Sequence, residues 1–128
     1  MSSSPRTIVV FEAQHRWEPE LQRQFIDEPV RVRGCRTWSD LSAMALNPSQ
    51  LSLSDVIVIE LPEDATPCLQ WLGHVSSHWQ SRVPPLILIC GSDAAELEWI
   101  LRDIGVREVF VGELGGAQLA RCCRRMLA

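Results

Sequence analysis

Short apolar runs alternate with amphipathic stretches along the whole sequence, and this alternation limits the folds that the chain can adopt. Most of the runs are nearly continuous in Val, Ile and Leu, as is typical of strands that are buried on both faces. The run VRVRGCR instead alternates, which predicts an edge strand with one wetter face. The predicted strands span residues 7–13, 30–36, 55–61, 85–90 and 107–111.

Helix signals follow each of these runs. Trp17, Leu21 and Phe25 recur at intervals of four residues, which predicts a first helix over about residues 18–27. Cap residues and first-turn prolines predict where the other helices start. Those helices are expected to begin near Thr37, Thr66, Asp93 and residue 116.

A strand followed by a helix, five times over, predicts a (βα)5 domain. Helical crossovers between parallel strands are right-handed and place helices on both faces of the sheet. The predicted fold class is therefore α/β: a doubly wound, five-stranded parallel sheet in a three-layer α/β/α, flavodoxin-like arrangement. Residues 7–128 are expected to form a single domain after a disordered N-terminal tail over residues 1–6.

Composition and charge are those of a soluble globular protein. Hydrophobic residues make up 46% of the sequence and the formal net charge is −4, which argues against disorder and against a nucleic-acid-binding surface. The N-terminus lacks the apolar run of a signal peptide, and no stretch approaches the ~18 apolar residues of a membrane span. We therefore expect a cytoplasmic protein that does not bind membranes and whose five cysteines are reduced.

The first predicted strand is not followed by a glycine-rich turn, because the sequence there reads FEAQHR. A P-loop or a dinucleotide site needs glycines at this position so that the backbone can approach the phosphates. The Ser-, Thr- and Gly-rich phosphate loop of flavodoxins is also missing. The sequence thus predicts no nucleotide or flavin cofactor, although ligands of such sheets bind outside the carboxyl ends of the strands.

The chain length, the (βα)5 order and the string DVIVIELP resemble the receiver domain of two-component response regulators. The resemblance covers roughly residues 6–128. In that family the third strand ends in an aspartate that accepts a phosphoryl group, and two acidic residues at the end of the first strand help to hold Mg²⁺. A Ser or Thr ends the fourth strand and a lysine ends the fifth. The resemblance implies a regulatory domain of signal transduction.

The residues that carry the family's chemistry are replaced at these positions. Phe11 and Glu12 stand at the place of the acidic pair, and Glu60 stands at the phosphoacceptor position. Cys90 and Gly112 replace the Ser/Thr and the lysine. The chain contains no lysine at all, so none can be supplied from another position. We interpret these five residues as a degenerate phosphoacceptor site.

Phosphoryl transfer depends on positioning and on neutralising the charge around the transferred group. Phe11 removes one of the oxygen ligands that Mg²⁺ needs. Loss of a single charge-stabilising group typically costs about two to three orders of magnitude in rate. We therefore predict that the chain is not phosphorylated, is not an enzyme and holds no metal.

Three interpretations of Glu60 stay open. It could mimic a phosphorylated aspartate and hold the domain permanently active. The preferred interpretation is a strand-end carboxylate that is solvated or accepts hydrogen bonds from nearby backbone N–H groups. A weak divalent cation shared between Glu12 and Glu60 is the third.

Five other residues are candidates for either a functional or a structural role. His74 and His78 have a spacing that could grip a metal, but no third ligand is evident and a solvated surface is preferred. Cys90 could be a reactive thiolate, but without a neighbouring Lys or His an inert core residue is preferred. Cys122 and Cys123 are interpreted as core filler and a surface thiol; no pair of cysteines has CxxC spacing.

Charged residues of opposite sign fall on two predicted helices, the fourth and the last. A two-fold arrangement could pair the acidic residues of one with the arginines of the other. If exposed, Trp99 and Trp17 would strengthen such an interface, since aromatic side chains dominate binding energy. The predicted interaction face comprises Glu96, Trp99, Asp103, Arg121, Arg124 and Arg125.

The leading hypothesis is a phosphorylation-independent pseudo-receiver. Such a module would bind a protein partner, a signalling component, and could form a homodimer through the fourth helix, the fifth strand and the last helix. The alternative is a flavodoxin-like small-molecule or redox sensor. It would use the pocket at the carboxyl ends of the strands, with Glu12, Glu60 and Cys90.

Overall fold

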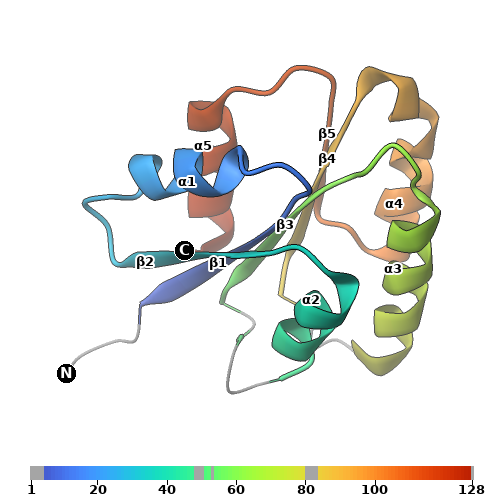
Figure 1. Ribbon diagram of the computed structural model, residues 1–128, viewed down its shortest axis with the longest axis horizontal. Helices are drawn as coiled ribbons and strands as arrows, with labels where there is room; N and C mark the ends of the chain where they lie inside the picture. The colour runs from blue at the N-terminus through green and yellow to red at the C-terminus, as the bar shows by residue number, and fades with distance from the viewer. Residues whose placement is uncertain (1–4, 48–50, 53, 80–83, 128) are drawn as a thin grey trace.

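The structure of the protein is a computed structural model that describes residues 5–47, 51–52, 54–79 and 84–127, without the side chains of 76–79. Within these ranges strands and helices alternate along the chain (Figure 1). The elements are β1 (Arg6–Phe11), α1 (Trp17–Gln24), β2 (Val30–Cys35), α2 (Trp38–Ala45), β3 (Val56–Glu60), α3 (Thr66–Trp79), β4 (Leu86–Cys90), a 3₁₀-helix η1 (Ser92–Leu97), α4 (Glu98–Ile104), β5 (Glu108–Val111) and α5 (Gly116–Leu127).

The strands form one parallel sheet in the order β2-β1-β3-β4-β5. This order confirms the predicted doubly wound sheet, and β2 lies at its edge as its alternating sequence predicts. Phe11 pairs with Cys35 and Glu60 pairs with Ile89, so the carboxyl ends of the strands meet at one edge of the sheet. That edge is where ligands of such folds bind.

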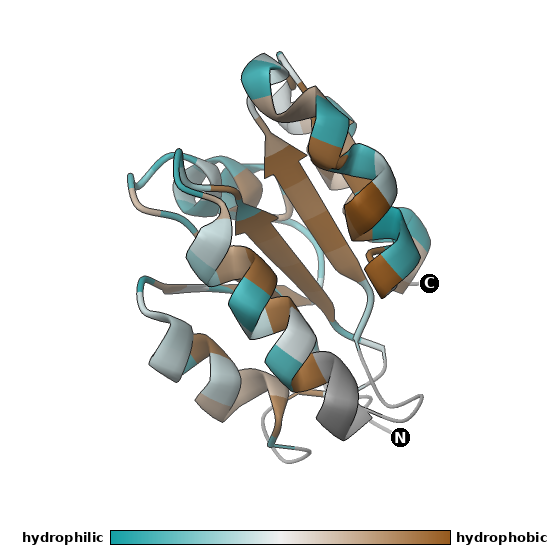
Figure 2. Cartoon of the chain, turned by 90° about the vertical axis from the view of Figure 1, so that its right-hand side faces the viewer, coloured by the Kyte–Doolittle hydropathy of each residue, from teal (hydrophilic) through white to brown (hydrophobic). Residues whose placement is uncertain are grey.

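Helices cover both faces of the sheet, with α1 and α5 on one side and α2, α3 and α4 on the other (Figure 1). Each face has its own core, because successive side chains of a strand point in opposite directions. In β3, Val56 and Val58 pack toward α1 and α5, whereas Ile57 and Ile59 pack toward α2 and α3. Figure 2 shows apolar strands beside helices that are apolar in part only.

Of the two helix caps predicted at threonines, the cap of α2 is confirmed and the cap of α3 is not. Thr37 caps α2, since its Oγ1 accepts a hydrogen bond from the Asp40 N–H at 3.0 Å. The predicted cap of α3 is wrong: Thr66 is already helical, and the carboxylate of Asp64, two residues earlier, accepts its N–H at 3.0 Å. This hydrogen bond lowers the pKa of Asp64.

Two helices have other bounds than the sequence predicts. The first ends at Gln24 rather than near residue 27, because Phe25 leaves helical geometry. The fourth does not run continuously from Asp93, because Ala94 has non-helical dihedral angles that separate η1 from α4. Gly105, with φ of +120°, follows the last residue of α4, as a glycine at a helix end commonly does.

A buried carboxylate at the opposite edge of the sheet holds the start of β1, a role that no sequence pattern indicates. One oxygen of Asp55 accepts the backbone N–H of Thr7 at 2.8 Å, and the other accepts that of Ser52 at 2.8 Å. Asp55 therefore ties β1 to the segment that leads into β3. None of the described helices has the length and apolar content that a membrane span requires.

Candidate functional site

A cavity of about 870 Å³ lies at the carboxyl edge of the sheet, within the usual size range of ligand pockets. It is bordered by the start of α1, by the ends of β3 and β4, and by the turns that follow β4 and β5. Glu60, Cys90 and Gly112 line it, whereas Phe11 and Glu12 do not. The lining residues are Arg16, Trp17, Glu60, Leu61, Ile89, Cys90, Gly91, Ser92, Gly112, Glu113, Leu114 and Gly115.

Glu12 caps the N-terminus of α1. Its side chain is 3% exposed, and one oxygen accepts the N–H groups of Arg16 and Trp17 at 3.1 and 2.8 Å. The other oxygen accepts the N–H of Glu18 at 2.9 Å. A negative charge at this end of a helix is favourable because the first N–H groups have no partner within the helix. Both oxygens of Glu12 are thus engaged in fixing α1.

Glu60 is bound to the same helix by a different group. Its side chain is half-buried, and its Oε2 accepts a hydrogen bond from Trp17 Nε1 at 2.9 Å. The alternation of β3 directs Glu60 to this side of the sheet, since Val56 and Val58 pack there. Trp17 is therefore held by both glutamates: by Glu12 through its backbone and by Glu60 through its indole.

Phe11 belongs to the opposite core. Its ring stacks on Trp38 with centroids 4.0 Å apart, and Trp38 lies 5.7 Å from Trp71. Trp71 Nε1 in turn donates to Ser42 Oγ at 2.7 Å. At the sequence position where the resemblance implies a metal ligand, the chain thus has an aromatic side chain that packs β1 against α2 and α3.

Gly112 closes the site at the end of β5 with a backbone that favours glycine. Its φ is +89°, a conformation that residues with a Cβ rarely adopt. Its N–H donates to the carbonyl oxygen of Cys90 at 2.9 Å, which ties the ends of β4 and β5 together. At the sequence position where the resemblance to receiver domains implies a lysine, the chain therefore has no side chain and no cation.

Cys90 is a core residue with 2% of its surface exposed. Burial, followed by the negative charge of Glu98, raises the pKa of its thiol from 9.0 to about 11. The thiol is therefore protonated near neutral pH. It is a poor nucleophile in this form, because the thiolate is the reactive species. Cys122 and Cys123 are both buried, so the interpretation of one of them as a surface thiol is wrong.

Arg16 is a member of the cavity wall that the sequence did not reveal. Its guanidinium lies over the ring of Trp17, 4.4 Å from the centroid, in a cation–π contact. It comes from the start of α1 rather than from the end of β5, where the resemblance implies a lysine. The only sequence signal was a basic residue just before a predicted helix, which is not specific.

The predicted histidine pair is only partly described. His74 is exposed on α3, and the side chain of His78 lies outside the described residues. Among the residues that the structure describes, no three His, Cys, Asp or Glu side chains are grouped so that they could hold a metal ion. Glu12 and Glu60 point to the two hydrogen-bonding groups of one residue, Trp17.

The predicted interaction face, from here on the α4–α5 face, consists of Glu96, Trp99, Asp103, Arg121, Arg124 and Arg125. Trp99 is 69% exposed on α4. Next to it, Arg102 pairs with Glu98 at 3.1 Å and with Glu108 at 3.0 Å, so two of the nearby acidic residues are neutralised within the chain. Trp17 is 3% exposed, which corrects the expectation that it could anchor an interface.

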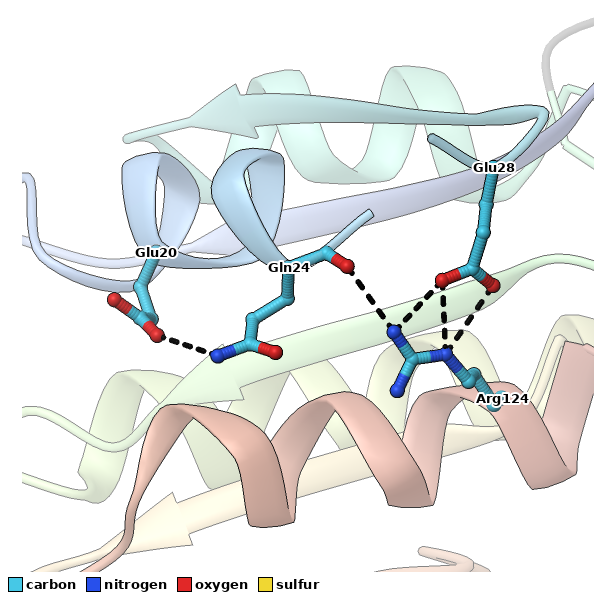
Figure 3. A network of polar contacts seen from close by, with 4 residues as sticks. All are labelled: Glu20, Gln24, Glu28 and Arg124. Atoms are coloured by element: carbon cyan, nitrogen blue, oxygen red, sulfur yellow. Dashed lines mark hydrogen bonds and ion pairs between the residues drawn. The ribbon is translucent and has the colours of Figure 1, made fainter. Parts of the chain in front are cut away.

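Arg124 holds α5 against the end of α1 (Figure 3). Its guanidinium pairs with Glu28 at 2.7 Å and donates to the carbonyl oxygen of Gln24 at 3.1 Å. It also lies over the ring of Phe25, 4.7 Å from the centroid. The hydrogen bond from Arg124 lowers the pKa of Glu28. Much of the bonding capacity of Arg124 is therefore used within the chain.

Comparison with known proteins identifies the fold. No protein-family model matches the chain, and no curated protein matches it in sequence. Solved structures do match, among them the N-terminal receiver domain of a response regulator from Bacteroides fragilis, with a TM-score of 0.75, 13% identity and 98% of both chains covered. The receiver domain of a putative LuxO repressor protein from Vibrio parahaemolyticus gives 0.75 and 14%, covering 96% of this chain and 90% of that one. A response-regulator receiver domain from Clostridium thermocellum gives 0.74 and 10%, covering 95% and 94%. The chain therefore has the flavodoxin-like fold of response-regulator receiver domains.

Proposed function

We propose that the protein is a phosphorylation-independent pseudo-receiver, a module that binds a protein partner in signal transduction. The observation that carries this proposal is the commitment of both site carboxylates to α1. Glu12 uses both oxygens on backbone N–H groups, and Glu60 binds the indole of Trp17. A metal bound by Glu12 would have to displace hydrogen bonds that fix the start of α1.

The electrostatics of the site support the same proposal. Transfer of a phosphoryl group needs cations around its oxygens, which receiver domains supply with Mg²⁺ and a lysine. Here Phe11 is packed against Trp38, and Gly112 has no side chain to offer. Arg16 is the one cation that lines the cavity among the described residues, and its guanidinium stacks on Trp17.

The proposed function predicts that the protein gains no phosphoryl group when it is incubated with acetyl phosphate and Mg²⁺. Intact-protein mass spectrometry measures the result, with a phosphorylatable receiver domain treated in parallel. The Glu60→Asp variant restores the family's acceptor residue and is also expected to stay unmodified, because lysine and the metal ligands are still missing. A mass gain of one phosphoryl group in the natural chain would refute the proposal.

Two alternatives at the site gain no support from the geometry. A phosphoaspartate mimic must be sensed by the residues that end β4 and β5, but Cys90 is buried, Gly112 has no side chain, and Glu60 binds Trp17 on α1 instead. A redox sensor needs a thiolate, and the raised pKa of Cys90 disfavours one.

The α4–α5 face is the proposed surface for partner binding, including a homodimer. We expect Trp99→Ala to weaken such association about thirtyfold, because an aromatic anchor typically contributes about 2 kcal/mol or more. Light scattering coupled to gel filtration, over a range of concentrations, measures the change. Ile26→Ala is the matched control, since Ile26 is 78% exposed but lies beyond α1. A natural chain that stays monomeric throughout, or an unchanged Trp99→Ala variant, would exclude this homodimer.

A further inference from the structure

The cavity at the carboxyl edge contains charges of both signs that no neighbour neutralises. Arg16, Glu60 and Glu113 line it, and none of them takes part in an ion pair among the described residues. Only one oxygen of Glu60 has a hydrogen-bond partner there, since Trp17 binds Oε2. The cavity thus offers acceptors for a cation and a donor group for an anion.

Trp17 keeps the two kinds of charge apart. The guanidinium of Arg16 lies over the face of the indole, 4.4 Å from its centroid, while Glu60 binds the edge of the same indole at Nε1. Trp17 is itself buried and fixed through its backbone N–H by Glu12. The face and the edge of one buried indole thus hold Arg16 and Glu60 in different places on the cavity wall.

The rest of the wall is small or apolar. Leu61, Ile89 and Leu114 supply aliphatic surface. Gly112 and Gly115 also line the cavity, and a Cβ at either position would meet no atom of a non-adjacent residue within 4 Å. Such a cavity can accept an apolar group next to the two separated charges.

We propose that this cavity binds a small zwitterion of the amino-acid or dipeptide class. Its ammonium group would bind Glu60 and Glu113, its carboxylate would bind Arg16, and its apolar part would lie against the aliphatic wall. A simple anion would be repelled by the two carboxylates, and a simple cation would be repelled by the guanidinium. Neither would therefore pair with all the charges that line the cavity. The inference rests on the proposed function, because a phosphoryl group on Glu60 would occupy the same space.

The test is a calorimetric titration of the full chain with the standard amino acids, one at a time, and with leucylglycine and glycylleucine. We expect at least one of them to bind with a Kd of about 1 mM or tighter. For a bound amino acid, its decarboxylated amine and its deaminated acid are expected to bind at least about tenfold more weakly, since each lacks one charged partner. Inorganic phosphate is titrated as the simple anion.

Variants separate this site from non-specific binding. Glu60→Gln and Arg16→Gln are each expected to weaken the best ligand about tenfold or more, while Gln at position 60 can still accept the Trp17 N–H. Glu63→Gln is the control: Glu63 is exposed, close in sequence and outside the cavity lining, so binding should not change.

Several outcomes would overturn the inference: no binding by any of these compounds, binding of phosphate alone, or equal binding by the Glu60→Gln variant. The acetyl phosphate experiment distinguishes this failure from failure of the proposed function. Absence of ligand binding together with an unmodified mass removes the ligand site only. A phosphoryl gain removes both.

Discussion

Replacement of Trp17 by alanine is expected to lower the free energy of unfolding by about 3–5 kcal/mol, the usual range for deletion of a buried aromatic side chain. Trp17 is 3% exposed and belongs to the core between the sheet and the α1–α5 layer. The variant also leaves Glu60 without its indole donor and Arg16 without the ring beneath its guanidinium. Urea denaturation followed by circular dichroism measures the loss.

Trp17→Phe is the matched variant, since it keeps an aromatic ring in the core and removes only the N–H and part of the volume. We expect it to cost about 1.5–3 kcal/mol, the range for one lost hydrogen bond to a charged group. A loss below 1 kcal/mol in Trp17→Ala, or equal losses in the two variants, would contradict the role of Trp17 as the packed link between α1 and the site.

Glu12→Ala is expected to cost about 2–4 kcal/mol, which is more than an ordinary helix cap contributes. The reason is the number of bonds: three backbone N–H groups at the start of α1 lose their acceptor, and one of them, that of Trp17, is buried. Thermal and urea denaturation measure the stability. Amide hydrogen exchange of Arg16, Trp17 and Glu18 should accelerate more than that of distant strands.

Glu12→Gln is the control for charge, because glutamine retains one acceptor oxygen in a side chain of the same length. It should lose less stability than Glu12→Ala, since one oxygen can still accept N–H groups of α1. Full stability in both variants would show that the helix start does not depend on this side chain. The carboxylate would then be available to bind a ligand.

The order of strands and helices, and their arrangement in layers, could be predicted because buried positions in each element require apolar side chains. The run 55–61 is apolar at successive positions, as a strand covered on both faces requires, and Val56 to Ile59 are indeed wholly buried. The edge position of β2 followed from its alternation. Ala94 shows the limit: one residue outside helical geometry divides a predicted helix, and nothing in its side chain indicates this.

The candidate site could be located from the sequence, but its bonds could not. Glu12 and Glu60 were expected at strand ends, and both are there. That Glu12 caps a helix five residues later was not predictable, because capping patterns concern residues next to the helix start. The partner of Glu60 depends on how α1 packs across the sheet, which is a tertiary property. Arg16 was missed for the same reason.

The turn at Gly112 has a consequence for anyone who would try to give this protein phosphoryl chemistry. A lysine placed there would adopt a backbone with φ of +89°, at a cost of about 1–2 kcal/mol for a residue with a Cβ. The direction in which its side chain leaves the backbone would also be set by this left-handed conformation. Engineering would therefore have to change the backbone of the connection between β5 and α5 before it introduces the cation. A single substitution at position 112 is not expected to give the protein phosphoryl chemistry.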